Sequence, residues 1–205
     1  MSSATAGGAT AAPDRRDPDA VRAAAQRIRL LAMDVDGTLT DGTIRIGAGG
    51  ELYKTFSVRD GFGLTLLAGA GIELALITGR RSAIVEQRAA ELGIRHVHQG
   101  VGDKRTVLTR LCTGLGIPLA DAAFIGDDWP DLGAMAACGL AAAPADAVPE
   151  VLAAADWIAA APAGDGAVRE LAMLLLDARD GRAAALARFQ AAAPKRSSRS
   201  AQRGG

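Results

Sequence analysis

The sequence predicts an α/β fold in which helices cover both faces of a parallel sheet, a three-layer sandwich. Short apolar runs alternate with helical stretches along the chain, which is the pattern of βαβ units. The strongest runs are almost continuously apolar, as expected for strands that are buried on both faces. Hydrophobic residues make up 49% of the 205 residues and aromatic residues only 3%. We therefore expect a Rossmann-like core built from small aliphatic side chains.

The expected elements follow one another in the order strand, helix, strand. Each strand is expected to run parallel to the others, because a helix separates it from the next strand. We expect strands at 28–34, 72–78, 96–99 and 122–127. We expect helices at about 61–70, 81–92, 103–115 and 129–137.

One segment, residues 43–56, breaks this alternation. It reads TIRIGAGGELYKTF, two short strands around a Gly-rich turn, and so predicts a β-hairpin directly after the first strand. The hairpin could extend one edge of the main sheet, or it could form a flap over the strand ends. The pattern leaves both alternatives open.

The ends of the chain differ in composition from the domain that we expect at 21–185. Residues 1–20 are small, polar and interrupted by proline, and 186–205 end in a basic stretch, so we expect a flexible arm at each end. The N-terminus lacks the apolar stretch of a signal peptide, and no uncharged run is long enough to span a bilayer. Two cysteines, Cys112 and Cys138, fit reduced thiols. We expect a cytoplasmic protein.

The charge balance bears on the partners of the protein. Lys and Arg number 23, as do Asp and Glu, so the formal net charge is zero. Nucleic acids and anionic membranes both attract an excess of basic residues. We therefore expect neither as a partner.

Polar side chains follow the predicted strands at the points where these end. Because the carboxyl ends of parallel strands meet at one edge of a sheet, these side chains are expected to converge there. A single acid at such a place is usually a helix cap, but capping does not explain the whole set. The set consists of Asp34, Asp36, Thr78, Lys104, Asp127, Asp128 and Asp131.

Such a cluster of carboxylates limits which ion the site can bind and which reaction it can catalyse. Two carboxylates about 4 Å apart repel each other by roughly 4 kcal/mol at an effective dielectric constant near 20, so they need a cation between them. A set of oxygen donors without His or Cys favours a hard ion, Mg²⁺ first. A carboxylate beside this ion, with a lysine and a hydroxyl opposite, is equipped to attack phosphorus.

Four motifs resemble those of the haloacid dehalogenase-like phosphatases, over residues 28 to about 180. They are DVDGTLTDG at 34–42, ITGR at 77–80, Lys104, and GDDWPDL at 126–132. The resemblance implies that Asp34 is the nucleophile and Asp36 the general acid and base. A chain turn at Gly37 would bring both carboxylates to one phosphate.

The same resemblance implies the remaining roles at the site. Thr78 and Lys104 would hold the phosphate oxygens. Mg²⁺ would lie on Asp34, the backbone carbonyl of Asp36, and Asp127. Asp128 and Asp131 would support the metal.

Two other classes of protein deserve comparison. Bacterial receiver domains also gather acids, a threonine and a lysine around Mg²⁺, but their acid pair comes first, and here the pair at 127–128 comes last. A catalytically idle subunit that only binds a sugar phosphate is the second alternative, although every motif residue is present.

The spacing leaves no room for a cap domain, so we expect an open site that a neighbouring subunit closes. SVRDGFG at 57–63 and AGDGAVREL at 163–171 resemble segments of the capless 3-deoxy-D-manno-octulosonate (KDO) 8-phosphate phosphatases. These are homotetramers of lipopolysaccharide synthesis. The resemblance implies a phosphorylated sugar acid as substrate.

The resemblance also implies which residues contact this substrate. Guanidinium groups match the geometry of carboxylates and phosphates. Arg88 could instead be solvated, and Arg59 could pair with Asp60. The implied substrate-binding residues are Ser57, Val58, Arg59, Asp60, Gly61, Arg80 and Arg88, with Asp36 and Lys104 from the motifs.

Three residues depart from the pattern of these phosphatases. Thr38 stands where a valine is frequent, Thr65 where some members have an arginine, and Asp165 where a basic residue is common. Because the last two changes bear on anion binding, a related sialic-acid-type 9-phosphate stays open as the substrate.

Overall fold

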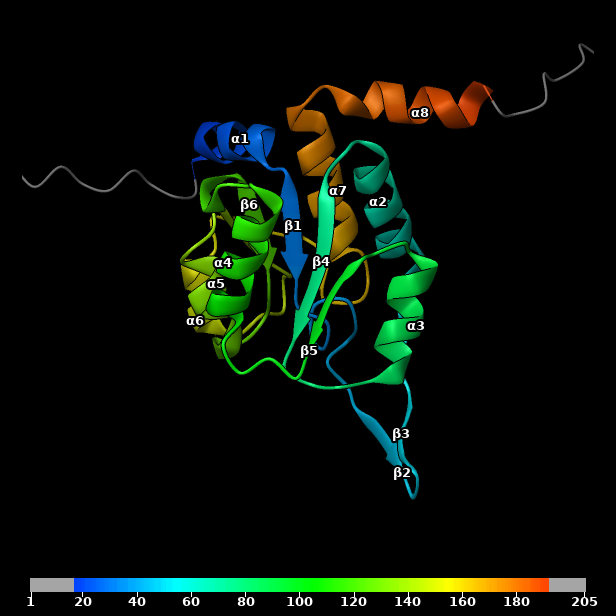
Figure 1. The fold of residues 1–205 in the computed structure, drawn as a ribbon. Coiled ribbons are helices and arrows are strands. Elements are labelled where there is room, and N and C mark those ends of the chain that lie inside the picture. Colours follow the sequence, from blue (N-terminus) through cyan, green and yellow to red (C-terminus); the bar gives the residue numbers. More distant parts are fainter. Residues whose placement is uncertain (1–16, 192–205) are drawn as a thin grey trace, which may run out of the picture.

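A computed structural model describes residues 17–191 and contains the predicted sandwich. Within these residues the main sheet has six strands in the order β5-β4-β1-β6-β7-β8, and every neighbouring pair is parallel. The central strand β1 therefore lies between β4 and β6 (Figure 1). The strands are β1 (Leu30–Met33), β4 (Glu73–Thr78), β5 (His96–Gln99), β6 (Ala122–Ile125), β7 (Leu140–Ala143) and β8 (Trp157–Ile158).

Helices cover both faces of the sheet. On β1, Leu31 and Met33 pack in one apolar cluster while Leu30 and Ala32 pack in another, because successive side chains point to opposite faces. The first cluster lies under α1 (Pro18–Arg27), α2 (Val58–Gly69), α3 (Ala83–Glu91) and α7 (Ala167–Ala178). The second lies under α4 (Lys104–Leu115), α5 (Leu132–Met135) and α6 (Pro149–Ala154).

Every predicted strand is present, but two strands and four helices of the described residues were not predicted. Strand β7 reads LAAA and β8 has two residues, so neither carries the β-branched run that marks a strand. Helix α7 follows the segment at 163–166 and was not predicted as a helix. The helix expected at 129–137 is a 3₁₀ turn, η2 (Trp129–Asp131), followed by the short α5. Another 3₁₀ turn, η1 (Leu119–Asp121), leads into β6.

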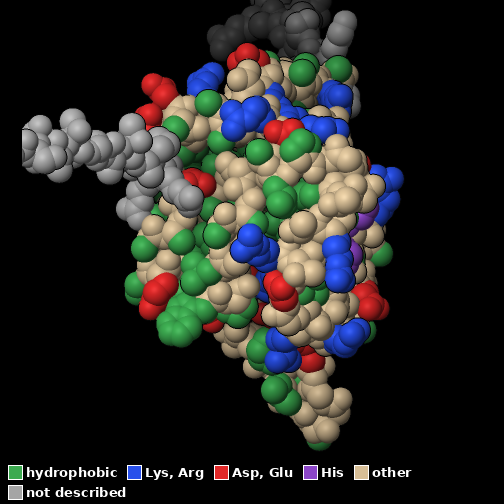
Figure 2. Space-filling model, turned by 60° about the vertical axis from the view of Figure 1, so that its left-hand side comes forward, with side chains coloured by type: hydrophobic (Ala, Val, Ile, Leu, Met, Phe, Trp, Pro, Cys, Tyr) green, Lys and Arg blue, Asp and Glu red, His purple; other side chains and the backbone are tan. Residues whose placement is uncertain are grey.

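The predicted hairpin consists of β2 (Arg45–Gly47) and β3 (Gly50–Tyr53), which pair antiparallel. It forms a separate two-stranded sheet, so the alternative of an edge hairpin of the main sheet is wrong. Figure 1 shows it projecting beyond the carboxyl ends of the strands, and Figure 2 shows the same projection below the body of the molecule. Within the described residues no backbone hydrogen bond joins it to the main sheet, and its contacts with the body of the protein come from side chains such as Lys54 and Glu51.

Helical structure extends into both segments that we expected as arms. Helix α1 starts at Pro18, because Asp17 caps it by accepting a hydrogen bond from the Asp19 N–H at 3.2 Å. At the other end, α8 (Gly181–Ala191) is held by an edge-on contact between Phe189 and Phe62, with ring centroids 5.2 Å apart. Residues 18–20 and 186–191 are therefore helical, Asp17 is the cap of α1, and residues 1–16 and 192–205 lie outside the described part of the chain.

In the described part of the chain, every helix is too short or too polar to cross a lipid bilayer. Figure 2 shows basic and acidic side chains interspersed on the face that it presents.

Candidate active site

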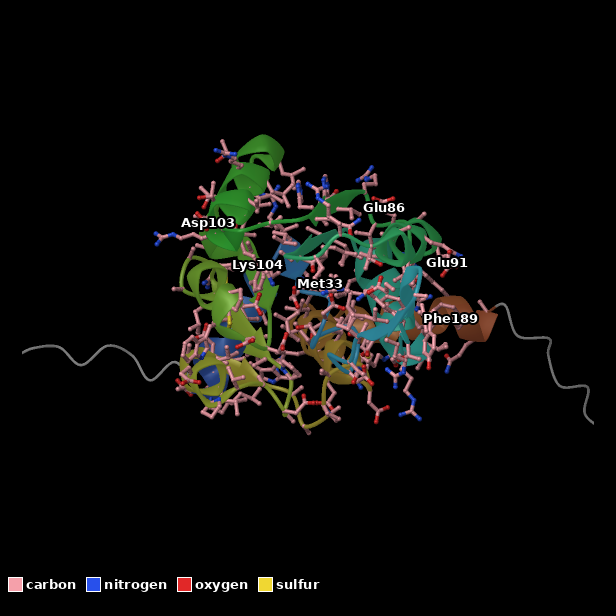
Figure 3. The ribbon with its side chains drawn as sticks, turned by 90° about the horizontal axis from the view of Figure 1, so that it is seen from below. Met33, Glu86, Glu91, Asp103, Lys104 and Phe189 are labelled. Carbon is pink, nitrogen blue, oxygen red and sulfur yellow. The ribbon has the colours of Figure 1, made fainter. Side chains whose placement is uncertain are left out.

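The carboxyl ends of the central strands bring distant parts of the chain together. Asp34 follows β1, Thr78 ends β4, Lys104 begins α4 after β5, and Asp127 follows β6. Figure 3 looks onto this edge of the sheet, where the labelled Lys104 lies near Met33, the last residue of β1. The register of the sheet pairs Met33 with Leu76, which sets Thr78 level with the loop that carries the first acids.

A buried lysine links two of the acids. The Lys104 Nζ atom donates to Asp34 Oδ1 and to Asp131 Oδ1, each at 2.6 Å, and all three side chains are buried. The second oxygen of Asp131 accepts the N–H groups of Asp127 at 3.0 Å and Asp128 at 3.2 Å. Asp131 therefore fixes both the lysine and the loop that carries Asp127.

Three carboxylates meet within the range of one metal ion. Asp34, Asp127 and Asp131 each offer an oxygen, and these oxygens lie within 4.8 Å of one another. Burial raises the pKa of Asp34 to about 6, with the Asp131 charge adding to the rise and Lys104 opposing it. Burial and the charges of Asp34 and Asp131 raise the pKa of Asp127 to about 7. The cluster is thus short of positive charge, and its oxygen donors fit a hard divalent cation.

Asp128 lies apart from this cluster. Its side chain is exposed, and its Oδ1 atom accepts the Trp129 N–H at 2.7 Å, which caps η2. We expected Asp128 and Asp131 to act alike, but in the structure only Asp131 lies among the carboxylates.

The chain turns at Gly37, directly after Asp36, and the turn lies against Asp127 in the loop after β6. Gly37 has a φ of +100°, and a Cβ atom there would lie 2.1 Å from Asp127 Oδ2, so only glycine fits. The next residue, Thr38, donates from its hydroxyl to Asp127 Oδ1 at 3.2 Å. This turn therefore packs directly against the cluster of carboxylates.

Asp36 contacts the hairpin, which the sequence did not indicate. Lys54 on the chain just after β3 donates to Asp36 Oδ1 and forms an ion pair with Glu51 Oε1 at 2.8 Å. The Arg80 Nε atom lies 3.7 Å from Asp36 Oδ2. A lysine in a hairpin is ordinarily solvated, and Lys54 belongs to none of the four motifs, so no sequence signal marked it.

The start of α2 holds five of the expected substrate-binding residues, in different environments. Ser57 caps the helix, with its Oγ atom accepting the Asp60 N–H at 3.3 Å, while Val58 and Arg59 are exposed. The Asp60 side chain is buried and accepts the N–H groups of Gly166 at 3.2 Å and Arg169 at 2.7 Å. Asp60 therefore anchors α7. Its carboxylate bonds to these N–H groups and does not form the alternative ion pair with Arg59.

The two other expected arginines have different surroundings. Arg88 Nη2 donates to the Ser57 carbonyl at 3.4 Å, and a Cβ atom on Gly61 would lie 2.4 Å from that nitrogen. Arg88 is therefore packed against the start of α2 rather than simply solvated. The Arg80 side chain is about half exposed, at 49%, and faces Asp36 and Glu51. Of the three residues that depart from the expected pattern, Thr65 and Asp165 are exposed and Thr38 is buried.

The sandwich, with acids and a buried lysine at its strand ends, has the features of the haloacid dehalogenase-like hydrolases. The sequence model of that family matches residues 93–171. This match covers α4 and the loop after β6, and so includes Lys104, Asp127 and Asp131.

Individual relatives define the family further. The 3-deoxy-D-manno-octulosonate 8-phosphate phosphatase KdsC of Escherichia coli is 45% identical over 156 residues, which are 76% of this chain and 83% of the relative. The same-named phosphatase of Moraxella catarrhalis, solved with magnesium, phosphate and KDO, is 44% identical with a TM-score of 0.83, over 85% of this chain and 100% of that one. A hypothetical protein from Xanthomonas campestris is 43% identical with a TM-score of 0.82, over 84% and 94%. The chain belongs to the KdsC family of haloacid dehalogenase-like phosphatases.

Proposed function

We propose that this protein is a Mg²⁺-dependent phosphomonoesterase that hydrolyses 3-deoxy-D-manno-octulosonate 8-phosphate to KDO and inorganic phosphate, a reaction of lipopolysaccharide biosynthesis. The observation that carries the proposal is the buried Lys104, which bridges Asp34 and Asp131 inside a cluster of three carboxylates. The names of the relatives and the KDO bound to the Moraxella protein support this choice of substrate.

The donors at the site fit the proposed metal. Asp34, Asp127 and the backbone carbonyl of Asp36 would hold Mg²⁺, while Asp131 and, through solvent, the exposed Asp128 would support it. When bound, the ion would offset the charge of the phosphoryl group. Lys104 donates to Asp34 and Asp131 and adds a second positive charge beside the ion.

In the proposed reaction the Asp34 carboxylate attacks phosphorus, and the bond between phosphorus and the substrate oxygen breaks. Asp36 gives its proton to that leaving oxygen. It then takes a proton from a water molecule, which attacks the aspartyl-phosphate and restores Asp34 with release of phosphate. Thr78 and Lys104 bind the phosphate oxygens throughout. The buried contact with Lys104 holds Asp34 in one orientation for the attack.

The proposed sugar-acid contacts come from Ser57–Gly61 and the two arginines. Arg80 is the best placed, because it lies beside Asp36 and its guanidinium is half exposed. Its ion pairs with Asp36 and Glu51 are long, at 3.7 and 3.9 Å, so we propose that the guanidinium turns to take the substrate carboxylate as a bidentate partner. Arg88 and Asp60 are occupied by protein contacts, and we propose that they shape the start of α2 around the substrate.

We further propose a cytoplasmic homotetramer in which each subunit closes a neighbour's site. The chain between β1 and α2 holds only the hairpin, and the chain between β4 and β5 holds only α3, so neither connection carries a cap. The hairpin exposes Ile46, Leu52 and Tyr53, and apolar side chains gathered on a projection favour contact with another protein surface.

Phosphate release by the purified protein tests the proposed substrate. The assay compares the KDO phosphate with a sialic-acid-type 9-phosphate and with common hexose phosphates, each with Mg²⁺ and with EDTA. We expect EDTA-sensitive release with a clear preference for the eight-carbon acid. Better turnover of another phosphate would contradict the substrate but keep the chemistry, and no release from any of them would leave only the idle subunit.

The nucleophile is tested by Asp34→Asn. An amide cannot attack phosphorus, so we expect turnover to fall by at least about 10⁴-fold. Circular dichroism should show an unchanged fold. The matched control is Asp41→Asn, the same change at an exposed residue of the same loop, which should keep wild-type turnover. Activity of Asp34→Asn near the wild-type rate would contradict the assignment.

A further inference from the structure

The hairpin supplies a buried cation to the site. The Lys54 side chain is 1% exposed although it belongs to a projecting segment, and it contacts Asp36 and Glu51. Burial disfavours the charged ammonium, yet these two carboxylates outweigh it and raise the pKa of Lys54 above its ordinary value. A buried charge is stable only with such partners, so the arrangement depends on all three side chains.

Glu51 is held in turn by the start of α3. The Ser82 hydroxyl donates to Glu51 Oε2, and the Ser82 N–H donates to Gln99 Oε1 at 2.6 Å. Ser82 is buried, and Gln99 is the last residue of β5. The contacts therefore run without a break from the main sheet, through the hairpin, to Asp36.

The two oxygens of Asp36 have different environments. Oδ1 accepts the hydrogen bond from Lys54. Oδ2 is buried and makes no hydrogen bond within the described residues, and Arg80 Nε approaches it only to 3.7 Å. A buried carboxylate oxygen without a donor is costly, unless a group of the substrate completes it.

From this asymmetry we propose that Lys54 is a positioning residue for the reaction. It holds Asp36 by Oδ1 and so leaves Oδ2 to exchange protons with the leaving oxygen and then with water. Glu51 and Ser82 hold Lys54 in this position. The inference rests on the proposed function, because it assigns a role to the acid and base of that reaction.

Kinetics of Lys54→Met test the proposal, because methionine has a similar length without the charge. We expect kcat to fall about tenfold to a hundredfold, the size of effect that misplacing a catalytic group produces, while KM changes less than threefold. Lys54→Arg, which keeps the charge, should recover part of the loss. Arg45→Met is the control, because Arg45 is a cation of the same hairpin that pairs with Asp41 and not with Asp36, and this variant should keep the wild-type kcat.

A double-mutant cycle separates positioning from a structural role. If Lys54 acts through Asp36, then Lys54→Met should have little further effect in the Asp36→Asn background. Equal losses in both backgrounds would overturn the proposal, as would an unchanged kcat of Lys54→Met. If Lys54→Met does not fold, Glu51→Gln replaces it, with an expected fall in kcat of at least about threefold at unchanged KM, and an unchanged kcat would again overturn the proposal.

The activity of the wild-type protein distinguishes a failure of the proposed function from a failure of the role proposed for Lys54. Absence of Mg²⁺-dependent phosphate release by the wild type would contradict the proposed function itself. An active wild type with an equally active Lys54→Met would contradict only the role of Lys54.

Discussion

Gly37 and Thr38 show how far single residues of the site follow from the sequence. The turn at Gly37 was predictable, because two acids on one extended strand cannot reach the same phosphate unless the chain bends. Its positive φ and its contact with Asp127 agree with that turn. The hydrogen bond from Thr38 to Asp127 was not predictable, because it depends on how a loop from β6 folds back across the sheet.

At this scale we predict a weaker metal site in Thr38→Val. The variant keeps the shape of the side chain but removes the hydroxyl that orients Asp127. Loss of such a partner of a metal ligand typically costs tenfold or more in affinity, so we expect the Mg²⁺ concentration for half-maximal activity to rise about tenfold. Measuring activity over a range of Mg²⁺ concentrations gives this half-maximal concentration for both proteins.

The matched control is Thr109→Val on the exposed face of α4. An unchanged Mg²⁺ requirement in Thr38→Val would show that the hydroxyl does not orient Asp127.

At the scale of the elements, a single distant side chain, Asp60, anchors the start of α7. Asp60 accepts N–H groups of Gly166 and Arg169, which lie 106 and 109 residues away along the chain. The N-terminus of a helix carries partial positive charge and unsatisfied N–H groups, so a buried carboxylate stabilises it. The pairing was not predictable, because more than 100 residues separate Asp60 from Gly166 and Arg169, and because the family resemblance implied that Asp60 contacts the substrate.

We predict that Asp60→Asn destabilises the fold. The amide can accept only with its oxygen, so at least one buried N–H loses its partner, at a cost of about 1–3 kcal/mol. Urea denaturation measures the free energy of unfolding. Asp165→Asn, the same change at an exposed residue beside α7, should cost much less. Equal stability of the two variants would contradict the anchoring role.

The strands divide in the same way into predictable and unpredictable ones. Strands β1, β4 and β6 carry Leu, Ile or Phe on both faces, and that pattern predicts buried strands. Strand β7 is Leu followed by three alanines, which favour helix as much as strand, and only its place between β6 and β8 makes it extended. The hairpin was predictable from its Gly-rich turn, but its attachment through Lys54 was not, because a solvated lysine and a buried one look alike in a sequence.

The charge of the whole site couples the stability of the molecule to pH. Burial raises the pKa of Asp34 to about 6 and of Asp127 to about 7, from an ordinary value of 3.8. The metal-free folded state therefore binds more protons than the unfolded state. Its stabilisation by these protons is complete below about pH 4 and is lost as the pH rises through 6 and 7.

We predict that the melting temperature of the protein in EDTA falls between pH 5 and pH 7.5. Mg²⁺ should raise the melting temperature more at pH 7.5 than at pH 5, because protons compete with the ion for the same carboxylates. Thermal unfolding at several pH values, with EDTA or Mg²⁺, measures both effects.

Asp127→Asn is the comparison for this experiment, since it removes the group with the larger shift. Its melting temperature in EDTA should depend less on pH than that of the wild type. A constant difference between the two proteins across the range would contradict the assignment of the pH dependence to this cluster.

The central place of β1 in the sheet also bears on the order in which the protein forms during synthesis. Strand β1 is synthesised early, but one of its two edges pairs with β6. Leu30 therefore has its partner on that side only after Ala122 has been synthesised. Asp34 likewise meets Lys104 only across 70 residues of chain. Pairings between such distant segments are slow to form. A ribosome must therefore have released more than half of the chain before the nucleophile has its partners, and a nascent chain cut short before β6 would expose the open edge of its central strand.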